Sequence, residues 1–495
     1  MDLDHYQDDS DILSESVTSE GTLEYPYPTS APANMGLYWI IAALEMLVGI
    51  CLLIMANKTI GPLILPFLFL AAGLVIHLLP AFRDPYVRRA FVLSFCTCVL
   101  VTGLAQNYAL AVFGEVQTAG DAIRFYDTVV MDTDSLTFHG GARLEIAAPL
   151  PVFLWRIVYR HTVVGPIEIG PWIGILLNSF LIAMSASIAV KAASYLTGNN
   201  PYSLRRLGSL FACCGMFWLF GALHVRDAFA LFLNVIVIWA CVKALASPGL
   251  KNSITAAIVI ALSALAMSYV RSGLVALFIV VVLLALFSWT RRATSNALAL
   301  ILPMAAIFIG LVLIPVILPY TGQVAFAVAE RAVHYGAGQY VPGSLGAKLV
   351  VNQPMPIRIP VGSVYMLVHP VPFWAGFRLS MGEYHWIKSY HAMFLLWVVP
   401  SAIVGLVMAL RRTVAGGVTA PAMSFVALYV IVTLMAVAAT SLETRHYAQF
   451  LPAFLLLAAL PDKNDPTVRR KLILAAAGWY SFMTVGYVIW FGLKL

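Results

Sequence analysis

Charged residues are scarce in this chain: Asp, Glu, Lys and Arg make up 11% of its 495 residues, against 61% hydrophobic residues. In soluble globular domains about a quarter of the residues are charged. Folding alone cannot hide so much apolar surface from water, and nearly uncharged runs of about 18 or more residues recur along the chain. These proportions exclude an ordinary soluble enzyme and indicate that a bilayer is the solvent for most of the sequence.

Cysteine is also rare, and all six cysteines lie inside apolar runs, where a thiol behaves as a small hydrophobic group. They are Cys51, Cys96, Cys98, Cys213, Cys214 and Cys241. A disulfide framework or a zinc site is therefore not expected.

Several motifs of nucleotide-using and hydrolytic enzymes are missing from the sequence. It contains no Walker A loop, no G-x-G-x-x-G, no H-E-x-x-H and no G-x-S-x-G. No cofactor or energy source is therefore visible. Any chemistry would use a preactivated substrate that is already in the membrane.

Lys and Arg are absent from the first 35 residues, which carry eight acidic side chains. The segment is rich in Ser and Thr and lacks the basic start and small-residue cleavage site of a signal peptide. We expect 1–35 to be a disordered acidic tail, and 36–495 to be a transmembrane domain that begins with an uncleaved anchor.

Thirteen apolar runs follow the tail and predict an all-α polytopic membrane protein with about 11–13 transmembrane helices. The runs are 36–56, 60–80, 91–113, 171–194, 207–223, 227–246, 254–270, 273–290, 296–319, 390–410, 420–439, 447–461 and 472–492. Some are short for about 30 Å of hydrocarbon, so a segment such as 207–246 is expected to be bent or partly re-entrant.

Basic clusters in six successive loops fall on one side of the membrane if the N-terminus is cytoplasmic. They are Arg83/Arg88/Arg89, Arg205/Arg206, Lys251, Arg291/Arg292, Arg411/Arg412 and Lys463/Arg469/Arg470/Lys471. The positive-inside rule makes that side the cytoplasm. These basic residues mark loops, and no basic, aromatic-studded surface for nucleic acid is visible, so nucleic acid is excluded as a partner.

This topology leaves two long segments facing outward, about 114–170 and 320–389. In the first, 148–160 sets four apolar side chains against a polar side with Arg156 and Arg160, which predicts a helix lying in the membrane interface. In the second, 364–377 is apolar but interrupted by prolines, and we expect it to be re-entrant or interfacial.

Chemically competent side chains recur at the outward ends of the predicted spans, where charge is costly unless it is paired or solvated. GDAIRFYD (120–127) contains Asp121, Arg124 and Tyr126. A carboxylate here can accept a proton from a hydroxyl nucleophile or bind a divalent cation. An ordinary helix N-cap is the alternative role for Asp121.

Two further outward turns carry arginine. HVRDAFALF (224–232) holds Arg226 and Asp227, and SYVRSG (268–273) holds Arg271. Guanidinium groups bind phosphate in a planar, bidentate manner, so arginines at headgroup level suit a phosphate-linked substrate. Arg226 and Asp227 as a purely structural ion pair remain the alternative.

The segment SLETRHYAQFLPAF (441–454) adds Glu443, Arg445 and His446 just before a span that is broken by Pro452. We expect Glu443 and Arg445 to contact substrate. A lone histidine at such a place is more often a hydrogen-bonded interfacial residue than a general base.

Over about 114–460, this layout and these short motifs resemble bacterial integral membrane glycosyltransferases of the GT-C superfamily and related proteins of surface polysaccharide assembly. In that superfamily an acidic residue of the first extracytoplasmic loop acts at the acceptor or at a metal, and basic residues steady a polyprenyl phosphate. The resemblance implies that Asp121 is catalytic and that Arg226, Arg271 and Arg445 lie at the phosphate. The loop here follows the third span and not the first.

The resemblance implies an enzyme of the bacterial cytoplasmic membrane with a polyprenyl-linked sugar as donor, a glycan or lipid as acceptor, and membrane lipid around it. No cofactor is visible, and a divalent metal at Asp121 stays open. A polymerase of lipid-linked repeat units is mechanistically similar and is a further alternative. A transporter or flippase for a lipid-linked saccharide is another, although no convincing internal repeat is visible.

Overall fold

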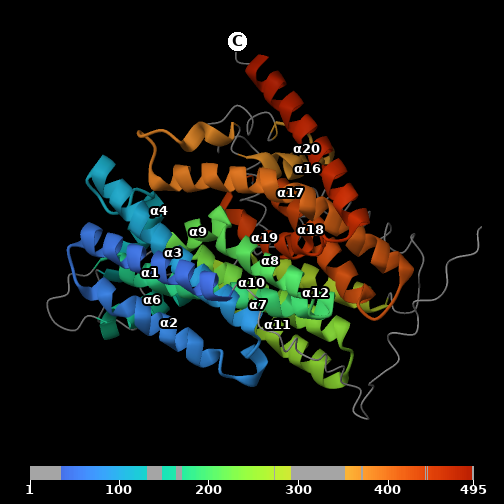
Figure 1. The fold of residues 1–495 in the computed structure, drawn as a ribbon, viewed down its shortest axis with the longest axis horizontal. Helices are drawn as coiled ribbons and strands as arrows, with labels where there is room; N and C mark the ends of the chain where they lie inside the picture. Colours follow the sequence, from blue (N-terminus) through green and yellow to red (C-terminus); the bar gives the residue numbers. More distant parts are fainter. Residues whose placement is uncertain are drawn as a thin grey trace, which may run out of the picture.

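The computed structural model describes residues 35–130, 148–162, 170–271, 274–290, 350, 352–369, 372–440, 442 and 444–492. Every element in these ranges is a helix (Figure 1). Eight of the described helices are long and apolar enough to cross a membrane, which confirms the prediction of an all-α polytopic membrane protein. They are α1 (Met35–Asn57), α3 (Pro85–Phe113), α7 (Trp172–Thr197), α10 (Asp227–Ala246), α11 (Leu250–Arg271), α17 (Glu383–Ala415), α18 (Ala420–Thr440) and α20 (Pro466–Gly492).

Several shorter helices complete the described part. They are α2 (Leu65–Ile76), α4 (Gly120–Val130), α6 (Pro149–Thr162), α8 (Pro201–Ala212), α9 (Gly215–Ala222), α12 (Val275–Thr290), α16 (Met355–Val368), α19 (Leu451–Ala459), and the 3₁₀ helices η2 (Gly61–Leu63), η3 (Pro80–Phe82), η7 (Phe373–Gly376) and η8 (Thr444–Ala448).

Three of the predicted spans differ from single long helices. The only α-helix in the run 60–80 is the 12-residue α2, and the only α-helix in 447–461 is the nine-residue α19. The run 207–223 is interrupted between α8 and α9, at the bend expected for 207–246. The tail 1–34 and the run 296–319 lie outside the described residues.

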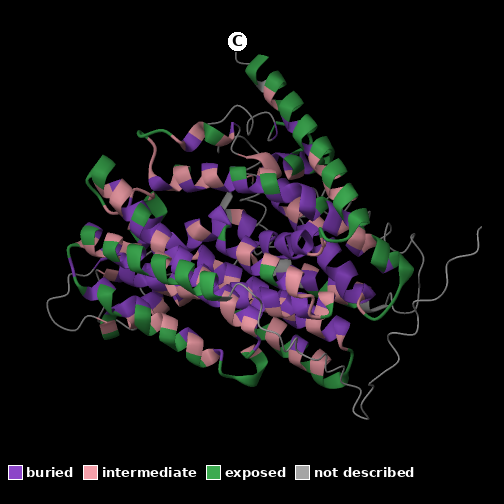
Figure 2. Cartoon of the chain, viewed as in Figure 1, coloured by how far each residue is buried: buried purple, intermediate pink, exposed green. Residues whose placement is uncertain are grey.

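The helix α7 forms the centre of the bundle. It packs against α3, α6, α8, α9 and α10, and most of its side chains are buried (Figure 2). Small residues fill its middle, including the buried Ser185, Ala186, Ser187 and Ala189. Small side chains let helix backbones approach closely, which is how packing is gained where lipid removes the hydrophobic drive between helices.

The outermost helices turn large apolar side chains away from the protein. Leu44 of α1, Leu262 of α11 and Val488 of α20 are each more than half exposed. In Figure 2 the long helix α20 is exposed along most of its length and projects beyond the bundle. Such a surface is unfavourable in water and suits contact with lipid chains.

Close backbone contact explains one glycine inside a span. A Cβ added to Gly405 of α17 would lie 1.9 Å from the carbonyl oxygen of Leu457 in α19. Only glycine permits this approach, which lets the short helix α19 pack directly on α17.

Basic residues from separate loops gather at one end of the bundle, which we call the basic end. Arg206 NH1 donates to the carbonyl oxygen of Pro461 (2.9 Å) and NH2 to the hydroxyl of Ser401 (2.6 Å). Arg89 and Arg205 interact electrostatically across α3 and α8. α3 and α11 begin at this end and α7, α10 and α17 finish there, so the other termini of these five helices form the opposite end.

The helix predicted for 148–160 is present as α6, but its buried face differs from the expected one. Arg156, which we expected on a polar, solvated side, is 1% exposed. Its NH2 donates to the carbonyl oxygen of Thr128 at 3.3 Å. A buried guanidinium needs such acceptors, and α4 supplies this one. α6 also packs on α7 and α11, so it lies against the helical bundle.

Candidate functional site

Three chain segments meet at the opposite end, where two of them form an ion pair and the third adds a hydrogen bond. Arg271, the last residue of α11, places NH1 3.3 Å from Oδ1 of Asp227, the first residue of α10. Its NH2 lies 2.5 Å from Nε2 of His446 in η8. Arginine can only donate, so the imidazole accepts through Nε2. The two ionic side chains are only 12% and 10% exposed.

The turn before α10 is held by a buried amide. Asn178 of α7 donates from Nδ2 to the carbonyl oxygens of Leu223 (2.9 Å) and Val225 (3.0 Å). Its Oδ1 accepts from the indole of Trp155 in α6 at 3.2 Å. Asn178 therefore fixes the backbone that presents Arg226 and Asp227.

Arg226 connects this turn to the predicted catalytic helix. Its NH1 donates to the carbonyl oxygen of Val270 at 3.4 Å, beside Arg271. Its guanidinium carbon lies 5.8 Å from the ring centre of Phe125 in α4. Asp121 is four residues before Phe125, and residues at that spacing share a helix face. Asp121 thus lies one turn along α4 from the ring that contacts Arg226.

The carboxylate of Asp121 is exposed and belongs to the first turn of α4. The carbonyl oxygen of Ala119 accepts the first bond of this helix, from the amide of Ile123 at 3.0 Å, which makes Ala119 the N-cap. Asp121 is therefore beyond the capping position, although its charge still favours the positive end of the helix dipole. Arg124 and Asp127 are likewise exposed.

The position of η8 depends on a buried polar cluster between α10 and α18. Asn234 donates from Nδ2 to the carbonyl oxygens of Ala448 (3.1 Å) and Gln449 (2.7 Å). The hydroxyl of Tyr429 donates to Oδ1 of Asn234 at 2.5 Å. Non-helical backbone inside a membrane protein needs such partners because lipid offers none. This buried segment also explains why α19 is short: it begins inside the bundle.

A second buried carboxylate anchors the segment that leads into α4. Glu383, the first residue of α17, accepts from the amide of Thr118 at 2.8 Å and from its hydroxyl at 2.5 Å. Gly382 comes so close that an added Cβ would lie 2.2 Å from the Thr118 hydroxyl oxygen. Because Thr118 is three residues before Asp121, these contacts set where α4 begins.

Aromatic side chains pack around His224, in the turn that precedes α10. His224 is fully buried, with its ring centre 4.1 Å from that of Trp155 and 6.1 Å from that of Tyr126. Burial lowers the pKa of His224 to about 3, so its ring is neutral at physiological pH. Burial, followed by the charge of Asp127, raises the pKa of Tyr126. Tyr126 therefore enters this site as a neutral phenol.

The structure brings together Asp227, Arg271, Arg226 and, through Phe125, the face of α4 that carries Asp121. Glu443 lies outside the described residues, and Arg445 is placed only by its backbone in η8, next to His446. Asn178, Asn234 and Glu383 belong to none of the sequence motifs. The two asparagines had a recognisable signal, since each is a polar residue inside an apolar run.

A protein-built metal centre finds no support in the described ranges. No group of three or more His, Cys, Asp or Glu side chains lies together there. What the arrangement offers is guanidinium groups for an anion and a carboxylate for a proton. Comparison with known proteins gives no match to a family model, a curated protein or a solved structure.

Proposed function

We propose that this chain is a membrane glycosyltransferase that uses a sugar linked to polyprenyl phosphate or pyrophosphate. The donor phosphate would bind at Arg226 and Arg271, and the acceptor, a glycan or lipid hydroxyl, would approach Asp121. The observation that carries the proposal is the convergence of two arginines from different helices at the opposite end.

The local charge favours an anionic ligand. Among the side chains that the structure describes at the ion pair, Arg226 and Arg271 contribute two positive charges and Asp227 contributes one negative charge. These three side chains carry a net positive charge in surroundings that screen poorly, where an added phosphate gains more than it would in water. Asp227 and His446 also orient the Arg271 guanidinium, so its planar fork is set before the ligand arrives.

Bond cleavage in this scheme needs no cofactor, since the sugar–phosphate bond is already activated. Asp121 accepts the proton of the acceptor hydroxyl while that oxygen attacks the anomeric carbon and the bond to the phosphate oxygen breaks. The arginines stabilise the charge that develops on the departing phosphate. Glu383 acts on Asp121 only indirectly, by fixing Thr118 and the start of α4.

We further propose that the basic end faces the cytoplasm and that the N-terminus lies there too. The supporting observation is that basic residues from loops far apart in sequence share one end. The candidate site then faces outward across a bacterial cytoplasmic membrane. Surface polysaccharide or glycolipid assembly is the pathway that fits this location.

The alternatives differ in what they require of the bundle. A flippase or transporter needs binding groups near the bilayer midplane, whereas the ion pair here joins the first residue of α10 to the last residue of α11. A polymerase of lipid-linked repeat units would use the same phosphate-binding and proton-accepting groups. The geometry therefore favours transfer chemistry over transport and is compatible with both kinds of transferase.

Turnover by the purified full chain is the direct test. Synthetic undecaprenyl-phosphate and undecaprenyl-pyrophosphate sugars would be supplied in detergent with glycan acceptors, and released lipid phosphate would be measured. Donor consumption that depends on Arg271 is expected. Lipid-linked saccharide that crosses the bilayer of proteoliposomes with no chemical change would instead establish a flippase.

A further inference from the structure

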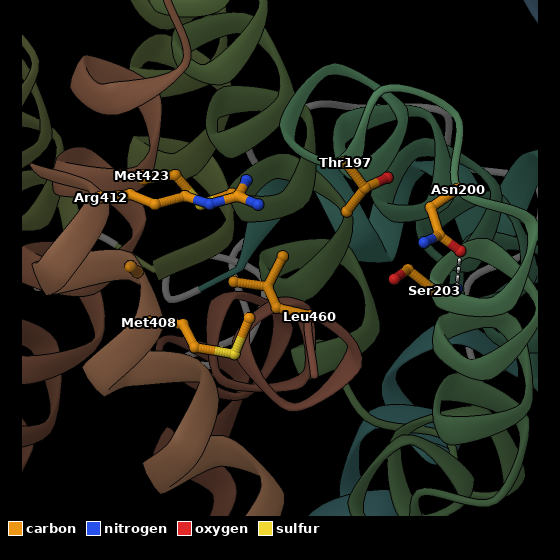
Figure 3. A pocket seen from close by; sticks show the side chains of 8 residues that line it. Thr197, Asn200, Ser203, Met408, Arg412, Met423 and Leu460 are labelled. Carbon is orange, nitrogen blue, oxygen red and sulfur yellow. Dashed lines mark hydrogen bonds between the residues drawn. The ribbon is translucent and has the colours of Figure 1, made fainter. Parts of the chain in front are cut away.

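A pocket at the basic end, distant from the candidate site, is lined by the ends of several helices. It has a volume of about 70 Å³ and lies between the last residue of α7, the first turn of α8 and the last turns of α17 (Figure 3). Asn200 and Ser203 line it from the start of α8, Arg412 and Met408 line it from α17, and Leu460 lines it from the end of α19. Polar and apolar side chains thus border the same space.

Three polar groups in this pocket make no hydrogen bond to any described residue. They are the Arg412 guanidinium, the Asn200 amide nitrogen Nδ2 and the Ser203 hydroxyl, and Figure 3 shows all three directed toward the space between α8 and α17. Ser203 is only 1% exposed, and its hydroxyl points into the pocket. Hydroxyl groups in such surroundings are normally paired, so a ligand with acceptor oxygens would complete this one.

The first turn of α8 does not itself supply the binding groups. Oδ1 of Asn200 accepts from the amides of Tyr202 (2.9 Å) and Ser203 (3.4 Å), so those donors are already used. This bonding fixes the orientation of the Asn200 side chain and leaves Nδ2 facing the pocket. The pocket therefore presents three side-chain groups that can donate, a guanidinium, an amide and a hydroxyl, of which the hydroxyl can also accept.

The charge around the pocket is positive. Arg206 lies close by, bonded to Pro461 next to the lining residue Leu460, and Asp462 offsets part of its charge. Arg412 has no ion pair with a described residue. A pocket with an unpaired guanidinium and two neutral donors matches a phosphate group, which carries negative charge and several acceptor oxygens.

We propose that this pocket binds the phosphate of an anionic phospholipid headgroup. Its walls are formed where α7, α17 and α18 end or begin, which is the headgroup level of a bundle that spans the bilayer. Met408 and Leu460 offer apolar contact to the part of the lipid next to its phosphate. Basic pockets between transmembrane helices are known to hold such headgroups. The inference does not depend on glycosyl transfer, because the pocket lies at the other end of the bundle.

Lipid titration of the purified full chain, followed by native mass spectrometry, tests this site. Phosphatidylglycerol is expected to be retained at one site, whereas diacylglycerol with the same chains but no phosphate should not be. Arg412→Gln should weaken retention roughly ten- to a hundredfold, the range for loss of a charge-assisted hydrogen bond, and Ser203→Ala a few-fold. Melting temperatures would establish that both variants are folded.

Arg411→Gln is the matched control, since Arg411 is exposed like Arg412 and adjacent to it in sequence, but is absent from the pocket lining. Its affinity for phosphatidylglycerol should stay near that of the unmodified protein. Equal weakening by Arg411→Gln and Arg412→Gln would overturn the proposal, because it would indicate diffuse attraction of anionic lipid to the basic end. Equal retention of phosphatidylglycerol and diacylglycerol would do the same.

A competition experiment distinguishes a lipid phosphate from free inorganic phosphate as the ligand. Millimolar inorganic phosphate should compete with phosphatidylglycerol if the headgroup phosphate supplies the binding energy. Binding of inorganic phosphate that depends on Arg412, in a protein that retains no phosphatidylglycerol, would overturn the lipid as the ligand and leave a soluble phosphate ester in its place.

Discussion

Asp227 and Asn234 lie seven residues apart on α10 and each holds a different part of the candidate site. Seven residues are almost two full turns, so the two side chains share one face of the helix, about 10 Å apart along its axis. Asp227 binds Arg271 at the end of α11, and Asn234 binds the carbonyl oxygens of Ala448 and Gln449. One helix face therefore aligns Arg271 with η8, where His446 accepts the other nitrogen of the same guanidinium.

Asn234→Leu tests this alignment. Loss of the amide leaves two buried carbonyl oxygens without their donor, and each such group costs on the order of 1–3 kcal/mol. We expect a lower melting temperature and a large loss of turnover, because His446 is no longer held beside Arg271. Thr433→Val is the control: it removes a buried hydrogen bond to Tyr429 within α18 that does not involve η8. Equal turnover in the two variants would contradict a positioning role for Asn234.

Arg271→Lys separates charge from geometry. A lysine keeps the positive charge but has a single ammonium group, which cannot reproduce the planar fork between Asp227 and His446. We expect turnover to fall by at least tenfold and the KM for the donor to rise, with normal protein levels in the membrane. Arg411→Lys, at the basic end, should leave both values unchanged. Full activity of the Arg271→Lys variant would exclude bidentate phosphate binding by this residue.

The sequence predicted the helical class, most of the long helices and the shared location of Arg226 and Arg271 because hydropathy and the positions of basic loops depend on local composition. It did not predict the break between α8 and α9 in detail, the short α19 or the burial of Arg156. Each of these depends on partners that are distant in sequence, such as Asn234 for η8 and Thr128 for Arg156.

The candidate site also combines features that the sequence predicted with features that it did not. Short motifs identified Asp227 and Arg271, but nothing in either motif indicated that they bond to each other and to His446. The link between Glu383 and Thr118 joins residues 265 positions apart and leaves no periodic signal in the sequence. Helix packing, and not local pattern, decides which charged ends meet.

Cysteine labelling tests the orientation. Glu115→Cys and Lys463→Cys place exposed thiols at the opposite end and the basic end, in a background from which the native cysteines have been removed. A membrane-impermeant maleimide should label position 115 in intact cells and position 463 only after permeabilisation. The reverse pattern would place the candidate site in the cytoplasm and exclude an outward-facing transferase.

His224 predicts how stability depends on pH. In the unfolded chain its pKa is near 6.5, whereas burial lowers the folded pKa to about 3. Between these values the unfolded state binds the extra proton, so the contribution of neutral His224 is complete above pH 6.5 and declines by about 1.4 kcal/mol per pH unit as pH falls toward 3.

His224→Gln should therefore flatten the fall in melting temperature between pH 6.5 and pH 5, measured as the difference from the unmodified protein. His369, whose pKa is also lowered to about 3 by burial and then by Lys388, remains in both proteins and cancels in that difference. Parallel pH curves for the two proteins would mean that His224 does not titrate with unfolding.

Asp121→Asn is the most direct test of the proposed chemistry. Asparagine keeps the volume and polarity of the side chain but cannot accept the acceptor's proton at neutral pH. Loss of a general base costs on the order of 10²–10⁴-fold in rate, so turnover should collapse while the KM for the donor and the melting temperature change little. Because Ala119 is the N-cap of α4, the stability effect should be limited to a weakened helix-dipole interaction, of about 0.3–1 kcal/mol.

Asp127→Asn is the matched control on the same helix. Asp127 is also exposed, but it is six residues from Asp121 and two from Phe125, so it does not share the face that contacts Arg226. This variant removes the same charge from α4 and should retain most of the turnover. If both variants lose activity equally, the acidic surface of α4 acts through its overall charge. If Asp121→Asn stays active while Arg271→Lys is inactive, the phosphate-binding role survives and the proton must leave by another group.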